Sequence, residues 1–174
     1  MKVTTKAGKE WVKRAMLNTK GKTILTPALN DESWFNMLRA RHSPIMEYEL
    51  YIESYVTERV YSHLVRHERI GKYVATSRPD IEGSTPISNK RFIGLSINAK
   101  RLIEICEQRL CKDAWHETTD FIKELVANIP DETLKKLCTA PCVKYDCCIG
   151  RSCCGYLNTN KFKEQRNFFL GLHL

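Results

Sequence analysis

The chain has 174 residues, of which 43% are hydrophobic and 28% charged, as is usual for one globular domain with its own core. It contains no apolar stretch long enough to span a bilayer and no signal-peptide core, so we expect a single domain over residues 1–174, without membrane association and cytoplasmic in location. The net charge of +8 suits nucleic acid, nucleotides or phosphate-bearing cofactors, although a basic face that only serves solubility would give the same charge.

The first part of the chain predicts short helices around one strand. A basic amphipathic helix is expected over residues 6–18, with Trp11 and Ala15 on one stripe, and Asp31 is placed to cap a second helix. Residues 48–56 alternate in polarity and are rich in Tyr, Ile and Val, which predicts a half-buried strand. Thr57 can cap the helix that follows.

The second part of the chain predicts mainly helices. Helical spacing of apolar residues continues from about residue 98 to residue 128, where Pro130 ends it, and a short helix is expected over 131–137. A cysteine-rich loop and a last helix over 160–172 complete the chain. The pattern favours an α+β fold, a helix-rich single domain with a small antiparallel sheet.

Cationic side chains gather on the helix after Thr57. Arg59, His63 and Arg66 stand at positions i, i+4 and i+7, which places them on one face and makes a plausible platform for an anion. Charged residues at a helix end more often lie in water, so each residue alone is weak evidence. The sequence has no GxGxxG or Walker pattern, so neither standard phosphate loop applies.

Asn98 and Arg109 are eleven residues apart, which places them on one face of the predicted long helix, about 16 Å from each other. An Arg on a partly apolar helix side is costly to bury without an anion. Taken alone, the spacing favours simpler roles: an N-cap for Asn98, and a salt bridge to Asp113 for Arg109.

Six of the eight cysteines lie between residues 138 and 154. Thiolates at this density could bind zinc, but there is no paired Cys-x-x-Cys motif, and the spacing is irregular. Buried small hydrophobes or disulfides are the alternatives. We therefore predict no metal site.

The segment from His63 to Arg78 resembles the signature of flavin-dependent thymidylate synthases. That signature is Arg-His-Arg, two residues, Ser, one residue, Asn-Glu, one residue, Ser, one residue, Arg-Tyr. Arg66, His67 and Arg78 match it at the correct spacing, and Thr76 replaces the last Ser conservatively.

Three further segments resemble the same family. Residues 96–100 and 108–117 are similar to its Asn-Ala-Arg and Arg-Leu-Cys hallmarks, and residues 42–44 to its upstream His-x-Ser-Pro turn. The matches run in the family's order from about Trp34 to Gly155. The chain is thus similar to a short, divergent member.

The resemblance implies a homotetramer with active sites between subunits, FAD as cofactor, NADPH as reductant, and transfer of a one-carbon unit from methylenetetrahydrofolate to carbon 5 of dUMP. By resemblance, five residues would contact FAD: Ser43, Arg66, His67, Asn98 and Lys100. Four would contact the nucleotide: His63, Thr76, Arg78 and Arg109. Arg109 would also be catalytic, because it would lie against the uracil ring and stabilise developing negative charge.

The chain departs from the family at several positions. Glu68 replaces the second Arg of the signature, Tyr73 and Val74 replace Asn-Glu, and only residues 79–97 separate Arg78 from Asn98 where members carry a longer insertion. These differences leave two alternatives open. One is a related pyrimidine modification at carbon 5, such as hydroxymethylation; the other is a non-catalytic relative that binds nucleotide or nucleic acid.

Overall fold

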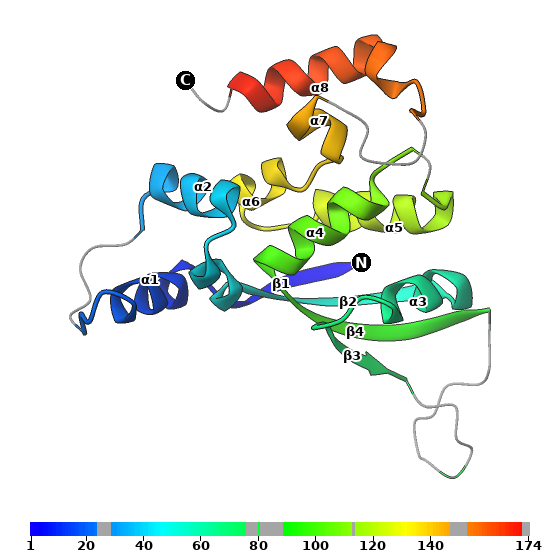
Figure 1. The fold of residues 1–174 in the computed structure, drawn as a ribbon. Helices are drawn as coiled ribbons and strands as arrows, with labels where there is room; N and C mark the ends of the chain where they lie inside the picture. The colour runs from blue at the N-terminus through cyan, green and yellow to red at the C-terminus, as the bar shows by residue number, and fades with distance from the viewer. Residues whose placement is uncertain (24–28, 76–79, 81–88, 113, 147–152, 172–174) are drawn as a thin grey trace.

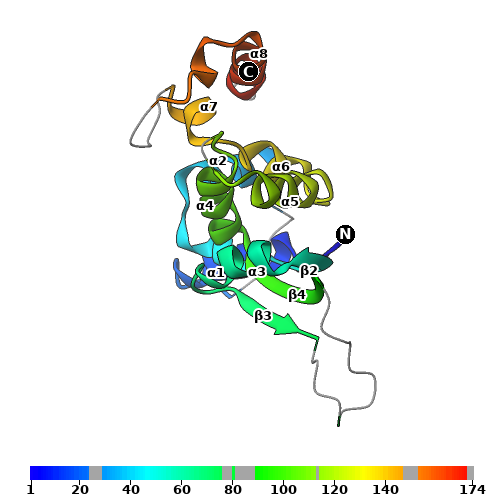
Figure 2. The ribbon, with the colours of Figure 1, turned by 90° about the vertical axis from the view of Figure 1, so that its right-hand side faces the viewer.

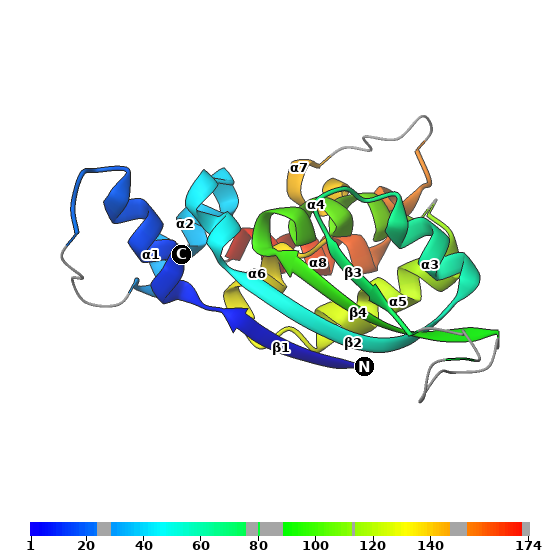
Figure 3. The same ribbon diagram turned by 90° about the horizontal axis from the view of Figure 1, so that it is seen from below.

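The computed structural model describes residues 1–23, 29–75, 80, 89–112, 114–146 and 153–171. Helices gather on one face of a small antiparallel sheet, which lies at the bottom of Figure 1. Seen from below in Figure 3, the strands lie in front of the helices, so the other face of the sheet is uncovered by them. This arrangement confirms the predicted α+β class.

The sheet has four strands in the order β1-β2-β4-β3, and every neighbouring pair is antiparallel. The strands are β1 (Lys2–Ala7), β2 (Glu49–Thr57), β3 (Gly71–Val74) and β4 (Lys90–Asn98). The predicted strand over 48–56 is confirmed as β2. It pairs along its whole length with β4, from Glu49 opposite Asn98 to Thr57 opposite Lys90.

The inner face of the sheet carries the core. Leu50 and Ile52 of β2 are fully buried beneath the helices, as is Ile93 of β4, whereas Tyr55 points outward and is 65% exposed. On the outer face the Tyr51 hydroxyl lies across Gly94, where a Cβ would clash with it. Gly94 therefore has a packing role, which explains a glycine in the middle of a strand.

The helices and 3-10 turns alternate with these strands and then follow them. They are α1 (Lys9–Asn18), α2 (Asp31–Ala40), η1 (Ser43–Glu47), α3 (Glu58–Val65), α4 (Ala99–Arg109), α5 (His116–Ala127), α6 (Glu132–Leu137), α7 (Pro141–Tyr145), η2 (Tyr156–Asn158) and α8 (Asn160–Gly171). Figure 2 shows α7 and α8 at one end, the central helices in the middle, and the sheet at the other end. No helix of the described residues is long and apolar enough to cross a membrane.

Most of the predicted helix N-caps are confirmed. Thr57 caps α3 by accepting from the Val60 N–H, and Asn98 caps α4 by accepting from the Arg101 N–H. The prediction for α2 is wrong by one residue, because the cap is Asn30 and not Asp31. An Asn or Asp side chain satisfies the same free N–H groups, so either residue could have served.

The predicted first helix is wrong in its start and in its buried face. Its first residues belong to β1, and α1 buries Val12 and Leu17, whereas Trp11 is 47% exposed. The Arg14 guanidinium lies over the Trp11 ring at 5.5 Å from its centroid. The buried face of α1 is therefore the face that packs against η1, and Trp11, the largest apolar side chain of the helix, does not lie on it.

The predicted long helix over 98–128 is also wrong, because it is two helices, α4 and α5. The chain reverses after Arg109, so that α5 packs beside α4. A single helix of that length would extend about 45 Å and could not bury both apolar faces in one small core. Folded back, Leu102 of α4 and Ile122 of α5 are both fully buried.

Candidate functional site

The predicted cationic face of α3 exists and continues onto α4. Burial lowers the pKa of His63, and the positive charges of Arg109, Arg66 and Arg59 lower it further. All three guanidinium groups therefore act on this imidazole. His63, Arg66, His67 and Arg109 are called the cationic cluster below.

The chain that leaves α3 is fastened to α4 at two points. Arg109 Nε donates to His67 Nε2 at 3.1 Å, and Arg101 Nε donates to the Glu68 carbonyl at 3.0 Å. Arg101 is held in turn by Glu104, with 2.8 Å between their charged groups. Residues 67 and 68 thus lie along α4 between its two arginines.

His67 is neutral in this setting. It is 3% exposed, and burial, followed by the charges of Arg109 and Arg101, lowers its pKa from 6.5 to about 4. Because Nε2 accepts a hydrogen bond from a guanidinium N–H, this nitrogen carries no proton. His67 therefore positions the Arg109 side chain without adding charge to the cationic cluster.

The beginning of α5 closes the cationic cluster on the other side. His63 Nδ1 lies 2.7 Å from the hydroxyl of Thr118, which is completely buried. The Thr57 hydroxyl donates to Glu117 at 3.1 Å. Neither contact was predicted, because both join residues more than fifty positions apart.

The guanidinium of Arg109 keeps donors for a ligand. Its one hydrogen bond to a described residue uses Nε, and its terminal N–H groups make none within that part of the chain. Burial and the neighbouring Arg66 charge lower its pKa. Arg66 itself is exposed and makes no hydrogen bond or ion pair with a described residue. The alternative partner of Arg109, Asp113, lies outside the described residues.

The other predicted FAD contacts lie at the opposite end of α4. The Asn98 side chain caps the helix at 2.9 Å from the Arg101 nitrogen, so the capping role suggested by spacing is confirmed. Lys100 lies in the first turn and is partly exposed. The Ala99 N–H donates to the Tyr48 carbonyl at 2.8 Å, which ties this end to the turn that begins with Ser43.

The structure thus gathers four of the predicted residues and separates others. His63, Arg66, His67 and Arg109 meet in the cationic cluster. Ser43, Asn98 and Lys100 form a second group about 16 Å away along α4. Thr76 and Arg78 lie outside the described residues. Whether any of these residues contacts FAD or a nucleotide stays a prediction.

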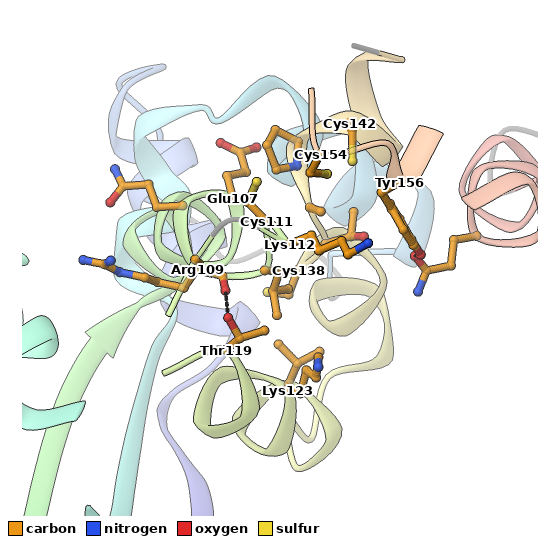
Figure 4. A pocket seen from close by; sticks show the side chains of 18 of the residues that line it. Glu107, Arg109, Cys111, Lys112, Thr119, Lys123, Cys138, Cys142, Cys154 and Tyr156 are labelled. Atoms are coloured by element: carbon orange, nitrogen blue, oxygen red, sulfur yellow. Dashed lines mark hydrogen bonds between the residues drawn. The ribbon is translucent and has the colours of Figure 1, made fainter. Parts of the chain in front are cut away.

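A cavity of about 1300 Å³ lies along α4 and past its last residue, where α5, α7 and η2 also line it. Figure 4 shows Arg109 at its edge, with the side chain directed away from the cysteines and its carbonyl accepting from the Thr119 hydroxyl at 2.9 Å. Cys111, Cys142 and Cys154 line this space. Arg109 therefore lies between this cavity and the cationic cluster, which its side chain joins through His67.

The cysteines of the described residues do not form a metal site. No group of three or more His, Cys, Asp or Glu residues is arranged to hold an ion within those ranges. Burial raises the pKa of the Cys142 thiol and that of Cys106, which favours their neutral forms. Cys147 and Cys148 lie outside the described residues.

A scan of the sequence against protein-family models finds no match, and a search of curated proteins finds none. Solved structures do match. The flavin-dependent thymidylate synthase ThyX from Helicobacter pylori, complexed with FAD and dUMP, matches with a TM-score of 0.60 and 16% identity, over 80% of this chain and 100% of that chain. The UMP/dUMP methylase PolB from Streptomyces cacaoi, bound with 5-Br dUMP, matches with a TM-score of 0.59 and 12% identity, over 80% and 97%.

At these identities the likeness establishes the fold. The expected thymidylate synthase-like fold is confirmed, because the match extends over essentially the whole of each solved chain.

Proposed function

We propose that this chain is a single-domain flavoenzyme that methylates carbon 5 of dUMP, with methylenetetrahydrofolate as carbon donor and NADPH as reductant. The observation that carries the proposal is the cationic cluster. It combines two arginines that have unused donors with two imidazoles, on a fold shared with proteins solved with FAD and dUMP. A phosphate-bearing ligand would supply the negative charge that these side chains lack.

The residues present fit FAD. Arg66 would hold a phosphate through its exposed guanidinium, and His67 would position the neighbouring Arg109. At the other end of α4, Asn98, Lys100 and Ser43 would contact the cofactor near a helix N-terminus, which favours anions. When bound, the flavin would supply the redox chemistry, so no side-chain nucleophile is required.

The nucleotide would lie next to Arg109. Its terminal N–H groups are available, and it is partly buried, so its charge would act strongly on a uracil ring that gains negative charge. His63 would contact the same ligand, fixed by Thr118. Thr76 and Arg78 would hold the nucleotide phosphate by resemblance. We propose a homotetramer in which subunits share such sites.

A non-catalytic binding protein is the second candidate. It is favoured by β3, because Gly71, Tyr73 and Val74 occupy signature positions where the family has Ser, Asn and Glu, and here they pair with β4 as a strand. Tyr73 is 60% exposed. Hydroxymethylation of the same carbon is a third outcome, which the product would reveal.

The test is a titration of the purified protein with FAD, followed by turnover. We expect a dissociation constant in the micromolar range or tighter, about −8 kcal/mol or better. Incubation with FAD, NADPH, methylenetetrahydrofolate and dUMP should then give dTMP by mass spectrometry. A hydroxymethyl product would select the related reaction, and dUMP binding without product would select the binding protein. Absence of FAD binding would refute the proposal.

A further inference from the structure

An arginine and a tryptophan form an exposed stack beside the cationic cluster. The Arg59 guanidinium lies over the Trp115 ring at 4.6 Å from its centroid, and the His116 ring lies 4.9 Å from the same ring. Trp115 is 40% exposed, although it lies next to a well-packed helix. An exposed indole of this kind is a common feature of binding surfaces.

Arg59 is not held by a carboxylate within the part of the chain that the structure describes. The neighbouring Glu58 pairs with Arg91 at 2.6 Å, and Glu117 accepts a hydrogen bond from Thr57 at 3.1 Å. The Arg59 side chain is exposed, so the guanidinium face turned away from Trp115 is accessible. Such a plane, oriented by an indole beneath it, is a cationic surface on which a second ring can stack.

This stack and the cationic cluster are parts of one surface. Arg59 and Arg66 are seven residues apart, about 10 Å along α3, and the imidazole of His63 lies between them. The charges of both arginines act on that imidazole. A ligand with its charge at Arg66 can therefore extend along α3 toward Arg59.

We propose that Arg59 and Trp115 form a ring-binding subsite, which takes a heteroaromatic ring of a phosphate-bearing ligand whose phosphate lies against Arg66. The proposed subsite rests on one part of the proposed function, namely that the cationic cluster binds nucleotides. Either a uridine nucleotide or a flavin nucleotide has this chemistry. Inorganic phosphate lacks the ring and would not use the subsite.

The chain offers a matched control. Arg14 lies over Trp11 at 5.5 Å, and Trp11 is 47% exposed, so this pair repeats the geometry on α1. Variants of Arg14 and Trp11 therefore show the general effect of losing an exposed Arg–Trp contact, apart from any effect on stacking at the proposed subsite.

The experiment measures dissociation constants by calorimetry for dUMP, FAD, 2-deoxyribose 5-phosphate and inorganic phosphate. Arg59→Ala and Arg59→Lys should both weaken dUMP or FAD about tenfold, because an ammonium keeps the charge but loses the plane. Trp115→Ala should do the same, and Trp115→Phe should retain most of the affinity. Affinities for the two ligands without a ring should change less than twofold. Whichever of dUMP and FAD responds identifies the source of the ring.

Arg14→Ala and Trp11→Ala should leave all four constants unchanged. Arg59 is exposed on a helix, so its variants should fold, and circular dichroism verifies this. If the wild type binds dUMP or FAD and the Arg59 and Trp115 variants bind both equally well, the subsite is refuted and the proposed function stands. If the wild type binds neither, the proposed function fails and the subsite with it.

Discussion

His67 should make the stability of the folded chain depend on pH. Its pKa falls from 6.5 to about 4 on folding, first because of burial and then because of Arg109 and Arg101. Between these two values the unfolded chain binds a proton that the folded chain does not. Stability contributed by neutral His67 is therefore complete above about pH 6.5 and is lost as the pH falls toward 4.

The size of the effect follows from the two pKa values. A difference of 6.5 − 4 corresponds to about 3 kcal/mol at and below pH 4, and to about 2.5 kcal/mol at pH 4.5. Small domains are stable by about 5–15 kcal/mol in total, so this loss should be easy to measure. It is large because protonation would also place a cation against the guanidinium that donates to Nε2.

The assay is urea unfolding of the wild type and of His67→Gln at several values between pH 7.5 and 4.5. A Gln side chain can still accept from Arg109 but does not titrate. The carboxylates titrate in both proteins, and His63 acts on His67 less than burial, Arg109 and Arg101 do, so the difference between the two pH dependences reports mainly on His67. The wild type should lose about 2.5 kcal/mol more than the variant. Parallel pH dependences would refute a buried, neutral His67.

Three further predictions concern the candidate site. Arg109→Ala should cut turnover on the order of a hundredfold and weaken dUMP binding with little change in FAD affinity, and Arg109→Lys should restore part of the turnover. Equal losses of melting temperature in Arg109→Ala and Asp113→Ala, with dUMP affinity unchanged, would instead support a salt bridge. Light scattering should report a homotetramer, and a monomer of about 20 kDa that still binds FAD would contradict a shared site. Asn98→Ala should cost about 1 kcal/mol of stability and weaken FAD, whereas Asn98→Asp should keep the cap, as melting temperature and FAD titration can measure.

Local signals predicted the elements that local chemistry determines. The strand β2 was predictable because alternation and β-branched or aromatic side chains coincide over nine residues, and Thr57 because a cap acts within three residues. β3 has only four residues and exists through its pairing with β4. In β4, Gly94 and Ser96 weaken the sequence pattern that predicts a strand. The glycine is there because it makes room for Tyr51 of another strand.

The break between α4 and α5 was invisible for a different reason. Cys106 and Phe121 are both buried, and their positions fit one continuous helical period even though they belong to two helices. Periodicity indicates which residues are buried, but not whether they belong to one helix or to two. The reversal after Arg109 depends on how α5 packs against α3 and α4, which is tertiary information.

In the candidate site, too, the local arrangement was predictable from the sequence and the long-range contacts were not. The stripe of Arg59, His63 and Arg66 follows from helical spacing, and the structure keeps it. The bond between Arg109 and His67 joins residues 42 positions apart, and no local pattern predicts it. Only the family resemblance placed these two residues in one site, and the stack of Arg59 on Trp115 likewise joins residues that are far apart in the chain.

Arg41 and the arginines of the cationic cluster have different kinds of partner within the described residues, and the difference argues for a ligand. Arg41 is held by Glu107, which also accepts from Lys144 at 2.8 Å, so a partly buried carboxylate offsets part of the positive charge of both side chains. In the cationic cluster the charges of the arginines lower the pKa of His63, the charge of Arg66 lowers the pKa of Arg109, and Arg109 donates to a neutral imidazole instead of a carboxylate. A structural role alone would be served better by the first arrangement, because unpaired like charges oppose folding. The cationic cluster therefore has the electrostatics of a site completed by an anion.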